Sequence, residues 1–254
     1  MVPVRKEGAR RAAAVVCFDL SGTLVAWNAA YEAALREAMG EWVGRWGDEG
    51  AAKALIEEAL LHYKKSRSRG KSKSAGIRDA VAVLQTESSE RTARHIAKEA
   101  RRLQPRKAAF VPGAEETLRQ LSGRYRLAIL TNLDAATAKE LWLRLKLHRF
   151  VLETDVFAAP AGMKKPEQRL FRAVAASLGT PPRHCVMVGD SYRRDVVGAV
   201  RSGWQAVWIR SSNASPASPR SALGRQLRIA TSITALPRLI RPAGRTAPSD
   251  PKDA

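Results

Sequence analysis

The sequence is poor in cysteine, histidine and aromatic residues, and it contains no long hydrophobic run. Only two cysteines and four histidines occur in 254 residues. Cys17 and Cys185 stand alone within apolar stretches, which excludes a disulfide framework and indicates two buried thiols in a reducing, cytoplasmic compartment. No apolar run approaches the roughly 20 residues that a membrane span needs, so we expect no membrane partner.

Acidic residues are scarce relative to basic ones. Lys and Arg total 44 against 24 Asp and Glu, which gives a formal net charge of +20 and a pI near 10.9. The densest basic run is KKSRSRGKSK at 64–73. We interpret this charge as a solvated basic surface. Nucleic acid is the less favoured partner, because no zinc-finger spacing, RNP-like aromatic motif or helix-turn-helix signal accompanies the charge.

The chain opens with a basic stretch and then changes its hydrophobic pattern twice. Residues 1–11 are expected to form a disordered basic arm, and residues 242–254 a disordered tail. The apolar run at 14–19 is typical of a parallel strand that is buried on both faces. Apolar residues then recur at helical spacing, which predicts an all-helical segment over 26–107. Its expected helices cover 27–39, 52–63, 76–85 and 89–103.

From residue 108 onward, expected strands and helices alternate. This alternation predicts an α/β core over 12–25 and 108–241, with a Rossmann-like, mostly parallel sheet and helices on both faces. The expected strands are 125–131, 155–159, 185–190 and 205–210. The expected helices are 112–121, 136–147, 166–179, 193–203 and a short last one at 234–240.

Polar side chains of catalytic type follow several of these strands. Asp19, Thr131 and Asp190 each stand where a strand ends, Asp195 follows five residues after Asp190, and Lys165 precedes a helix. The carboxyl ends of parallel strands meet at one edge of the sheet, so we expect these groups to converge there. Clustered carboxylates suit Mg²⁺, and a hydroxyl with a lysine suits a phosphoryl group.

Four short motifs at these positions resemble the haloacid dehalogenase-like (HAD) hydrolase superfamily. They are FDLSGTLV, LTN, KKPE and VGDSYRRD, in the order that the family shows, and the similarity spans about residues 14–241. The chain looks most like the phosphatases of this superfamily that carry a helical (C1-type) cap inserted after the first motif. The resemblance therefore implies that the helical segment 26–107 is a cap domain.

The resemblance also implies a role for each matching position. Asp19 would be the nucleophile that forms an aspartyl-phosphate. Mg²⁺ would be held by Asp19, the backbone carbonyl of Ser21, Asp190 and Asp195. The phosphoryl oxygens would be held by Gly22, Thr131, Asn132 and Lys165. The catalytic set is accordingly Asp19, Ser21, Thr131 and Lys165.

Ser21 departs from the family pattern, which has an aspartate there as the general acid and base. A well-placed group of this kind is typically worth about 10²–10⁴-fold in rate. We therefore expect a slower enzyme, least affected on substrates with good leaving groups. The dehalogenase branch also lacks this aspartate, but the pair Asp190 and Asp195 argues against a metal-free enzyme. A phosphonatase-like branch would need a Schiff-base lysine in the cap, for which Lys53, Lys64 and Lys65 are available.

Two functions of different classes remain open from the sequence. The first is a Mg²⁺-dependent hydrolase of a small phosphorylated metabolite. The alternative is a catalytically weak or inactive binding or regulatory protein, whose basic surface contacts an acidic partner or RNA. We expect a monomer or a homodimer, and the sequence does not encode the substrate in any motif.

Overall fold

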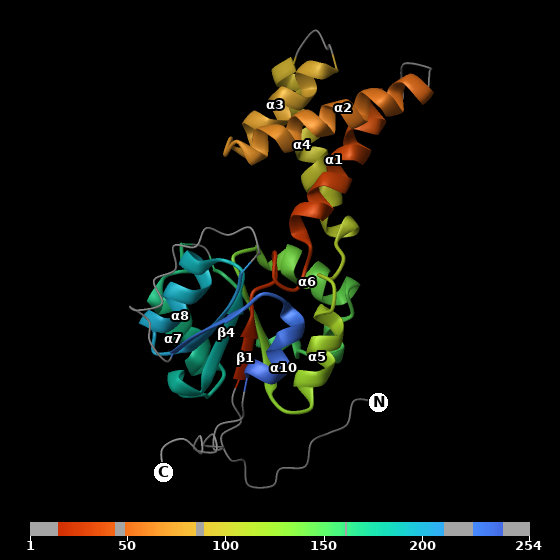
Figure 1. The fold of residues 1–254 in the computed structure, drawn as a ribbon. Helices are drawn as coiled ribbons and strands as arrows, with labels where there is room; N and C mark the ends of the chain where they lie inside the picture. Colours follow the sequence, from red (N-terminus) through yellow and green to blue (C-terminus); the bar gives the residue numbers. More distant parts are fainter. Residues whose placement is uncertain (1–14, 44–48, 85–88, 161, 211–225, 241–254) are drawn as a thin grey trace, which may run out of the picture. The chain divides into compact units, whose positions relative to one another are not determined.

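The computed structural model describes residues 15–43, 49–84, 89–160, 162–210 and 226–240. The predicted basic arm and the predicted tail lie outside these ranges. The chain divides into two compact units. The core unit comprises Met1–Val25 and Phe110–Ala254, and the helical unit comprises Ala26–Ala109 (Figure 1).

The core unit is built on a six-stranded sheet with the order β3-β2-β1-β4-β5-β6. Every strand pair in this sheet is parallel. The two central strands, β1 and β4, are buried along their whole length, as their apolar sequences predict. The strands are Val15–Phe18 (β1), Arg126–Thr131 (β2), Val156–Ala158 (β3), Cys185–Gly189 (β4), Gln205–Ile209 (β5) and Leu227–Ala230 (β6).

The prediction of an α/β fold with a mostly parallel sheet is confirmed, with one strand more than expected. The sequence analysis assigned no strand to 227–230, yet β6 pairs with β5 from Leu227 opposite Ala206. Three of its four residues are only partly buried. Because β6 is an edge strand and carries Arg228, it lacks the continuous apolar run by which the inner strands are predicted.

Helices cover the sheet on both sides (Figure 1). On one face, Phe171 and Val174 of α7 pack in the same cluster as Val15 and Cys17 of β1. The labelled helices α5 and α10 lie on the other side in Figure 1. The helices of the core unit are Ala114–Ser122 (α5), Ala135–Arg144 (α6), Gln168–Ser177 (α7), Gly198–Arg201 (α8) and Leu236–Leu239 (α10).

Two expected helices of the core unit differ in detail from those observed. The helix expected from Pro166 begins instead at Gln168, and the Lys165–Pro166 peptide bond before it is cis. The helix expected over 193–203 is a π-helical turn, Tyr192–Val197, that continues into the short α8. Both differences fall beside the expected site, where the backbone places Lys165 and Asp195.

In the described ranges 26–43, 49–84 and 89–109, the helical unit contains four α-helices around a hydrophobic core of its own. Leu35, Met39, Leu60, Ile77 and Ile96 are among its most deeply buried side chains. The helices are Trp27–Val43 (α1), Glu49–Ser68 (α2), Lys73–Val83 (α3) and Ser89–Leu103 (α4), followed by a 3₁₀ turn at Gln104–Lys107.

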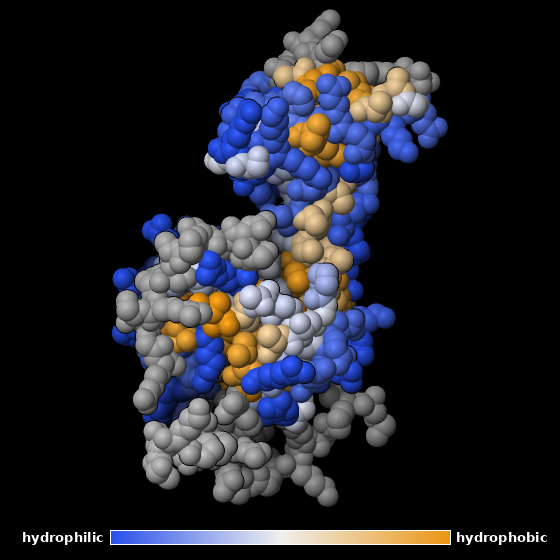
Figure 2. All heavy atoms as spheres, viewed as in Figure 1, coloured by the Kyte–Doolittle hydropathy of each residue, from blue (hydrophilic) through white to orange (hydrophobic). Residues whose placement is uncertain are grey.

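The basic run 64–73 is largely helical in the structure. Its first five residues complete α2, and Lys73 begins α3. Ser72 caps α3 by accepting a hydrogen bond from the Ala75 amide at 3.2 Å. The visible face of the helical unit is mostly hydrophilic, whereas that of the core unit also shows hydrophobic patches (Figure 2). Among the helices within the described ranges, none combines the length and apolarity that crossing a membrane requires.

Candidate active site

The turn after β1 places the first candidate residue. Asp19 directly follows the strand and is 4% exposed. The chain then turns at Gly22, which has φ +91° and donates its amide to the Val25 carbonyl at 2.8 Å. A Cβ at residue 22 would lie 2.5 Å from Oδ2 of Asp190. Glycine therefore serves both the left-handed backbone and the close approach of Asp190.

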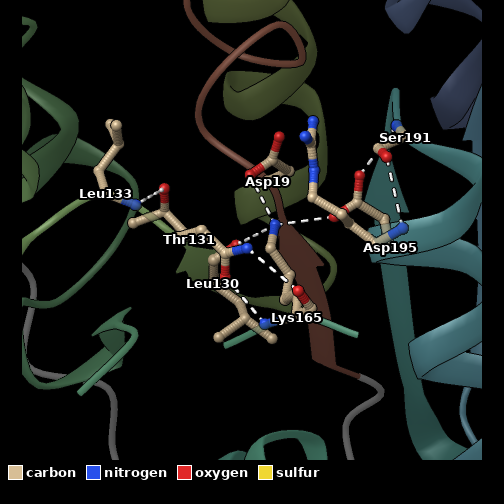
Figure 3. Close-up of polar contacts among 9 residues, drawn as sticks. Asp19, Leu130, Thr131, Leu133, Lys165, Ser191 and Asp195 are labelled. Atoms are coloured by element: carbon tan, nitrogen blue, oxygen red, sulfur yellow. Dashed lines mark hydrogen bonds and ion pairs between the residues drawn. The ribbon is translucent and has the colours of Figure 1, made fainter. Parts of the chain in front are cut away.

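Lys165 joins the carboxylates that sequence analysis placed at this edge. Its Nζ donates hydrogen bonds to Asp19 Oδ1 at 2.7 Å, to Asp195 Oδ1 at 2.7 Å and to the Leu130 carbonyl at 2.9 Å (Figure 3). The lysine is 2% exposed. Because an ammonium has three donors, all of them are used, and the charge is fixed between the two aspartates.

The titratable side chains of the site shift one another's pKa values. Burial raises the pKa of Asp19 to about 6, although Lys165 opposes this shift. Burial alone lowers the pKa of Lys165, but Asp19 and Asp195 outweigh it and raise that pKa above its usual value. Burial and the charge of Asp195 raise the pKa of Asp190. The site thus holds one ammonium against several carboxylates and favours a further cation.

The carboxylates fit a hard cation. Ligand oxygens of Asp19, Asp190 and Asp195 lie within 4.8 Å of one another. Both oxygens of Asp195 already accept hydrogen bonds, Oδ1 from Lys165 and Oδ2 from the Ser191 amide at 3.0 Å. The exposed Asp190 is the most open donor for Mg²⁺, which binds through few protein carboxylates. Asp195 also holds Lys165, and because each carboxylate oxygen can accept more than one contact, its role as a metal ligand stays a prediction.

Thr131 and Asn132, at the end of β2, have different surroundings. Thr131 is fully buried, and its Oγ1 accepts a hydrogen bond from the Leu133 amide at 3.1 Å (Figure 3). Its hydroxyl proton remains available to a ligand. The Asn132 amide instead clamps the backbone of Lys165, accepting from its N–H at 2.9 Å and donating to its carbonyl at 3.2 Å. As a phosphate ligand, Asn132 stays a prediction.

The backbone amides around Ser21 and Gly22 differ in whether they are already hydrogen-bonded. The Gly22 amide donates within the turn to the Val25 carbonyl, and its role as a phosphate ligand stays a prediction. The amides of Leu20 and Ser21 form none of the backbone hydrogen bonds found in this turn within the described residues. Ser21 itself is half-buried and forms a bridge with Val25.

Sequence analysis missed the residue that holds the backbone of Asp190. The indole N–H of Trp208 donates to the Asp190 carbonyl at 2.9 Å. Trp208 lies on β5 opposite Gly189, and its ring lies 5.2 Å from that of Tyr192. No sequence motif marks this tryptophan. Trp208 could have been found only from its pairing beside the strand that precedes Asp190, and that pairing can be predicted only once the strand order is known.

The three lysines considered for a Schiff base lie on α2 of the helical unit. Lys53, Lys64 and Lys65 are all exposed, and Lys64 pairs with Glu32 at 3.2 Å. A lysine that forms a Schiff base readily is normally buried, since burial favours its neutral amine. The exposure of these three side chains therefore argues against the phosphonatase-like alternative.

Comparisons with known sequences identify phosphatases as relatives of part of the chain. A glyceraldehyde 3-phosphate phosphatase of Methanothermobacter thermautotrophicus is 32% identical over 101 residues, which are 39% of this chain and 44% of that protein. A 5-amino-6-(5-phospho-D-ribitylamino)uracil phosphatase of Escherichia coli is 38% identical over 98 residues, 39% of each. The chain thus spans less than half the length of these curated relatives.

Comparisons with solved structures extend over nearly the whole chain. A HAD-family hydrolase of Bacillus subtilis matches with a TM-score of 0.64 and 18% identity, covering 90% of this chain and 99% of that one. A HAD phosphatase of Thermococcus onnurineus matches with a TM-score of 0.56 and 21% identity, covering 89% of this chain and 97% of that one. At these identities the match demonstrates a shared fold.

A family model supplies the assignment that fold likeness alone does not. The model for haloacid dehalogenase-like hydrolases matches residues 13–203. That range contains Asp19, Thr131, Lys165 and Asp190, which the structure brings to one edge of the sheet. The chain belongs to the haloacid dehalogenase-like hydrolases.

Proposed function

We propose that the protein is a Mg²⁺-dependent phosphohydrolase of a small phosphorylated metabolite, acting through an aspartyl-phosphate. The observation that carries the proposal is the position of Asp19. Its carboxylate is buried at the end of β1, and one oxygen is held 2.7 Å from the Lys165 ammonium. The names of the relatives, which include a phosphoserine phosphatase of Thermus thermophilus, favour a small phosphate ester as the substrate.

The first half-reaction is a displacement at phosphorus. The free oxygen of Asp19 attacks, the Asp19 O–P bond forms and the bond to the leaving oxygen breaks. Lys165, the Thr131 hydroxyl and the amides of Leu20 and Ser21 are donors for the phosphoryl oxygens. Mg²⁺, held by Asp19, Asp190 and the Ser21 carbonyl, would neutralise the negative charge that gathers on the phosphoryl group.

The second half-reaction is hydrolysis of the acyl phosphate. Water attacks phosphorus, the Asp19 O–P bond breaks, and inorganic phosphate leaves with the carboxylate restored. In neither half can Ser21 supply or accept a proton near neutral pH as an aspartate would. The leaving oxygen therefore takes its proton from water, which favours substrates with stable leaving groups.

The test is phosphate release from p-nitrophenyl phosphate in the presence of Mg²⁺. Asp19→Asn is expected to abolish the activity, because the amide cannot act as the nucleophile. Asp134→Asn is the matched control. Asp134 is the N-cap of α6, accepting from the Thr137 amide at 2.9 Å, and asparagine caps a helix equally well. Equal activity in the wild type and Asp19→Asn would overturn the proposal.

A further inference from the structure

The helical unit brings cationic side chains together around two buried tyrosines. Lys73 opens α3, and its ammonium lies 4.5 Å from the centre of the Tyr31 ring. Arg67 comes from α2, and its stem passes beside Gly76. A Cβ on Gly76 would lie 3.1 Å from the Tyr63 ring and 3.5 Å from Cδ of Arg67. The two helices therefore meet at the tyrosine pair with both cations beside it.

A third cation, Arg101, comes from α4. Its charge acts on both Tyr31 and Lys73. Burial, followed by the charges of Arg67 and Arg101, lowers the pKa of Lys73. We call Arg67, Lys73 and Arg101 the basic triad. All three residues are exposed, so solvent screens their mutual repulsion, and the positive charge that they present together is open to an anion from solution.

No carboxylate of the described residues pairs with the basic triad. Glu32, an acid whose charge reaches Tyr63, is already paired with Lys64 at 3.2 Å. Other basic residues of the unit do have acidic partners. These are Arg36, Lys64, Lys71, Arg78, Arg102 and Lys107. Lys53, Lys65, Arg69, Arg91, Arg94 and Lys98 form no ion pair within the described part of the unit either. The triad is distinguished by its place beside the two buried tyrosines.

The tyrosines add neutral donors to this charge. Tyr31 and Tyr63 are 2% and 4% exposed, and their ring centres lie 6.1 Å apart. Burial raises the pKa of Tyr31, and it raises the pKa of Tyr63 to about 12. Both hydroxyls therefore keep their protons at neutral pH and can donate hydrogen bonds. A guanidinium fork, an ammonium and phenol hydroxyls together match the several acceptor oxygens of a phosphoryl group.

The N-terminus of α3 also favours an anion beside the basic triad. This helix has 11 residues and begins at Lys73, so its first amides and the positive end of its dipole lie beside the basic triad. Asp79, the acid of α3, accepts from Lys71 at 2.7 Å and is thus occupied. The Arg67 guanidinium donates to the Lys71 carbonyl, which fixes its position.

We propose that the helical unit carries an anion site of its own, formed by the basic triad and the hydroxyls of Tyr31 and Tyr63, for the phosphoryl group of a small molecule. All five residues lie within Ala26–Ala109. The site is therefore independent of Asp19 and of the chemistry proposed for the core unit. A phosphate dianion suits three cations better than a single carboxylate does, because it carries more charge and more acceptor oxygens.

The four tyrosines of the chain allow the site to be observed directly. The protein is labelled in its tyrosine rings and titrated with inorganic phosphate at constant ionic strength, and NMR follows each ring. Tyr31 and Tyr63 report on the proposed site. Tyr192, two residues after Asp190, reports on the core unit's site. Tyr125 is the reference, because its hydroxyl is buried and donates to the Ile240 carbonyl at 2.8 Å.

Saturable shifts of the Tyr31 and Tyr63 resonances are expected, with Tyr125 unchanged. The triple variant Arg67→Gln, Lys73→Gln, Arg101→Gln should weaken phosphate binding at these two rings by at least about tenfold. A matched triple variant, which removes three exposed charges elsewhere on the unit, should bind as the wild type does. It carries Lys53→Gln, Arg91→Gln and Arg94→Gln.

Tyr31→Phe gives a second test that keeps the ring and its packing. Loss of one hydrogen bond to a charged group should weaken phosphate binding at Tyr63 by about tenfold. Shifts that chloride reproduces, or that persist in the triad variant, would overturn the site. Tighter binding of citrate, or a response only to an RNA oligonucleotide, would overturn its assignment to a small phosphorylated molecule. Shifts confined to Tyr192 would place phosphate in the core unit alone.

Discussion

At the scale of single residues, Ser21 places a half-buried hydroxyl two positions after Asp19. Ser21→Asp is expected to raise kcat on alkyl phosphates by about 10²–10⁴-fold, because it supplies the proton that a poor leaving group needs. The gain on p-nitrophenyl phosphate should be much smaller, since its leaving group needs little protonation. Steady-state kinetics on the two substrates provide the comparison. Equal gains on both would show that proton transfer does not limit turnover.

Substitutions of Asp190 and Asp195 are expected to impair the enzyme in different ways. Asp190 has its carboxylate open to a ligand, whereas both oxygens of Asp195 are occupied by Lys165 and the Ser191 amide. Asp190→Asn should raise the half-saturating Mg²⁺ concentration by more than the roughly 10–100-fold typical of residues behind a metal ligand. Asp195→Asn should mainly lower kcat, because Lys165 loses one of its anchors.

Mg²⁺ titrations of phosphatase activity separate the two variants. If Asp195→Asn shifted the Mg²⁺ requirement as far as Asp190→Asn does, Asp195 would be a metal ligand of equal rank. Lys164→Gln is a suitable control, because Lys164 adjoins Lys165 but its charge belongs to none of the contacts of the site. Its kcat and Mg²⁺ requirement should match those of the wild type.

The sequence predicted where the strand-end residues gather but not what each of them contacts. Asp19, Thr131 and Asp190 follow strands, and parallel strands bring their carboxyl ends together. The clamp from Asn132 to Lys165 joins two loops 33 residues apart in the chain. Such a contact depends on how the loops pack, which no local pattern encodes.

At the scale of elements, β5 supports the end of β4 through a side-chain contact. Trp208 of β5 donates to the carbonyl of Asp190, one residue beyond β4. Trp208→Phe keeps an aromatic ring beside Tyr192 but removes the N–H donor. It is expected to weaken Mg²⁺ binding by about tenfold, the lower end of what outer partners of a metal ligand contribute.

The readout for Trp208→Phe is the Mg²⁺ dependence of activity, with thermal unfolding measured alongside it. A purely structural role would lower the melting temperature and leave the Mg²⁺ requirement unchanged, and that result would contradict the prediction. Trp142→Phe is the matched control. Its indole N–H also donates to a backbone carbonyl, that of Val151 at 2.9 Å, but it belongs to α6 rather than to the candidate site.

The elements themselves were predictable to the extent that their hydrophobic pattern is strong. The buried strands β1 and β4 follow the sequence closely. The edge strand β6 and the π-helical turn before α8 do not. The strand β6 depends on its pairing with β5, and the π-helical turn depends on the contact between Asp195 and Lys165. Both are tertiary constraints.

At the scale of the whole molecule, the chain builds two hydrophobic cores. Leu35 is fully buried in the core of the helical unit. Phe171 is fully buried in the core unit. The centre of its ring lies 5.5 Å from that of Trp204, and the two ring planes form an angle of 87°. The chain passes between the units at residues 25–26 and 109–110. Because each core is formed within one unit, damage to one is expected to spread little to the other.

Leu35→Ala and Phe171→Ala test this independence as a pair. Each substitution removes a fully buried side chain and should cost its own unit about 2–5 kcal/mol. In hydrogen exchange measured by mass spectrometry, Leu35→Ala should accelerate exchange in peptides from α1–α4 and leave β1 and β4 protected. Phe171→Ala should give the reverse pattern. Equal acceleration in both units by either variant would show instead that the whole chain opens as one cooperative structure.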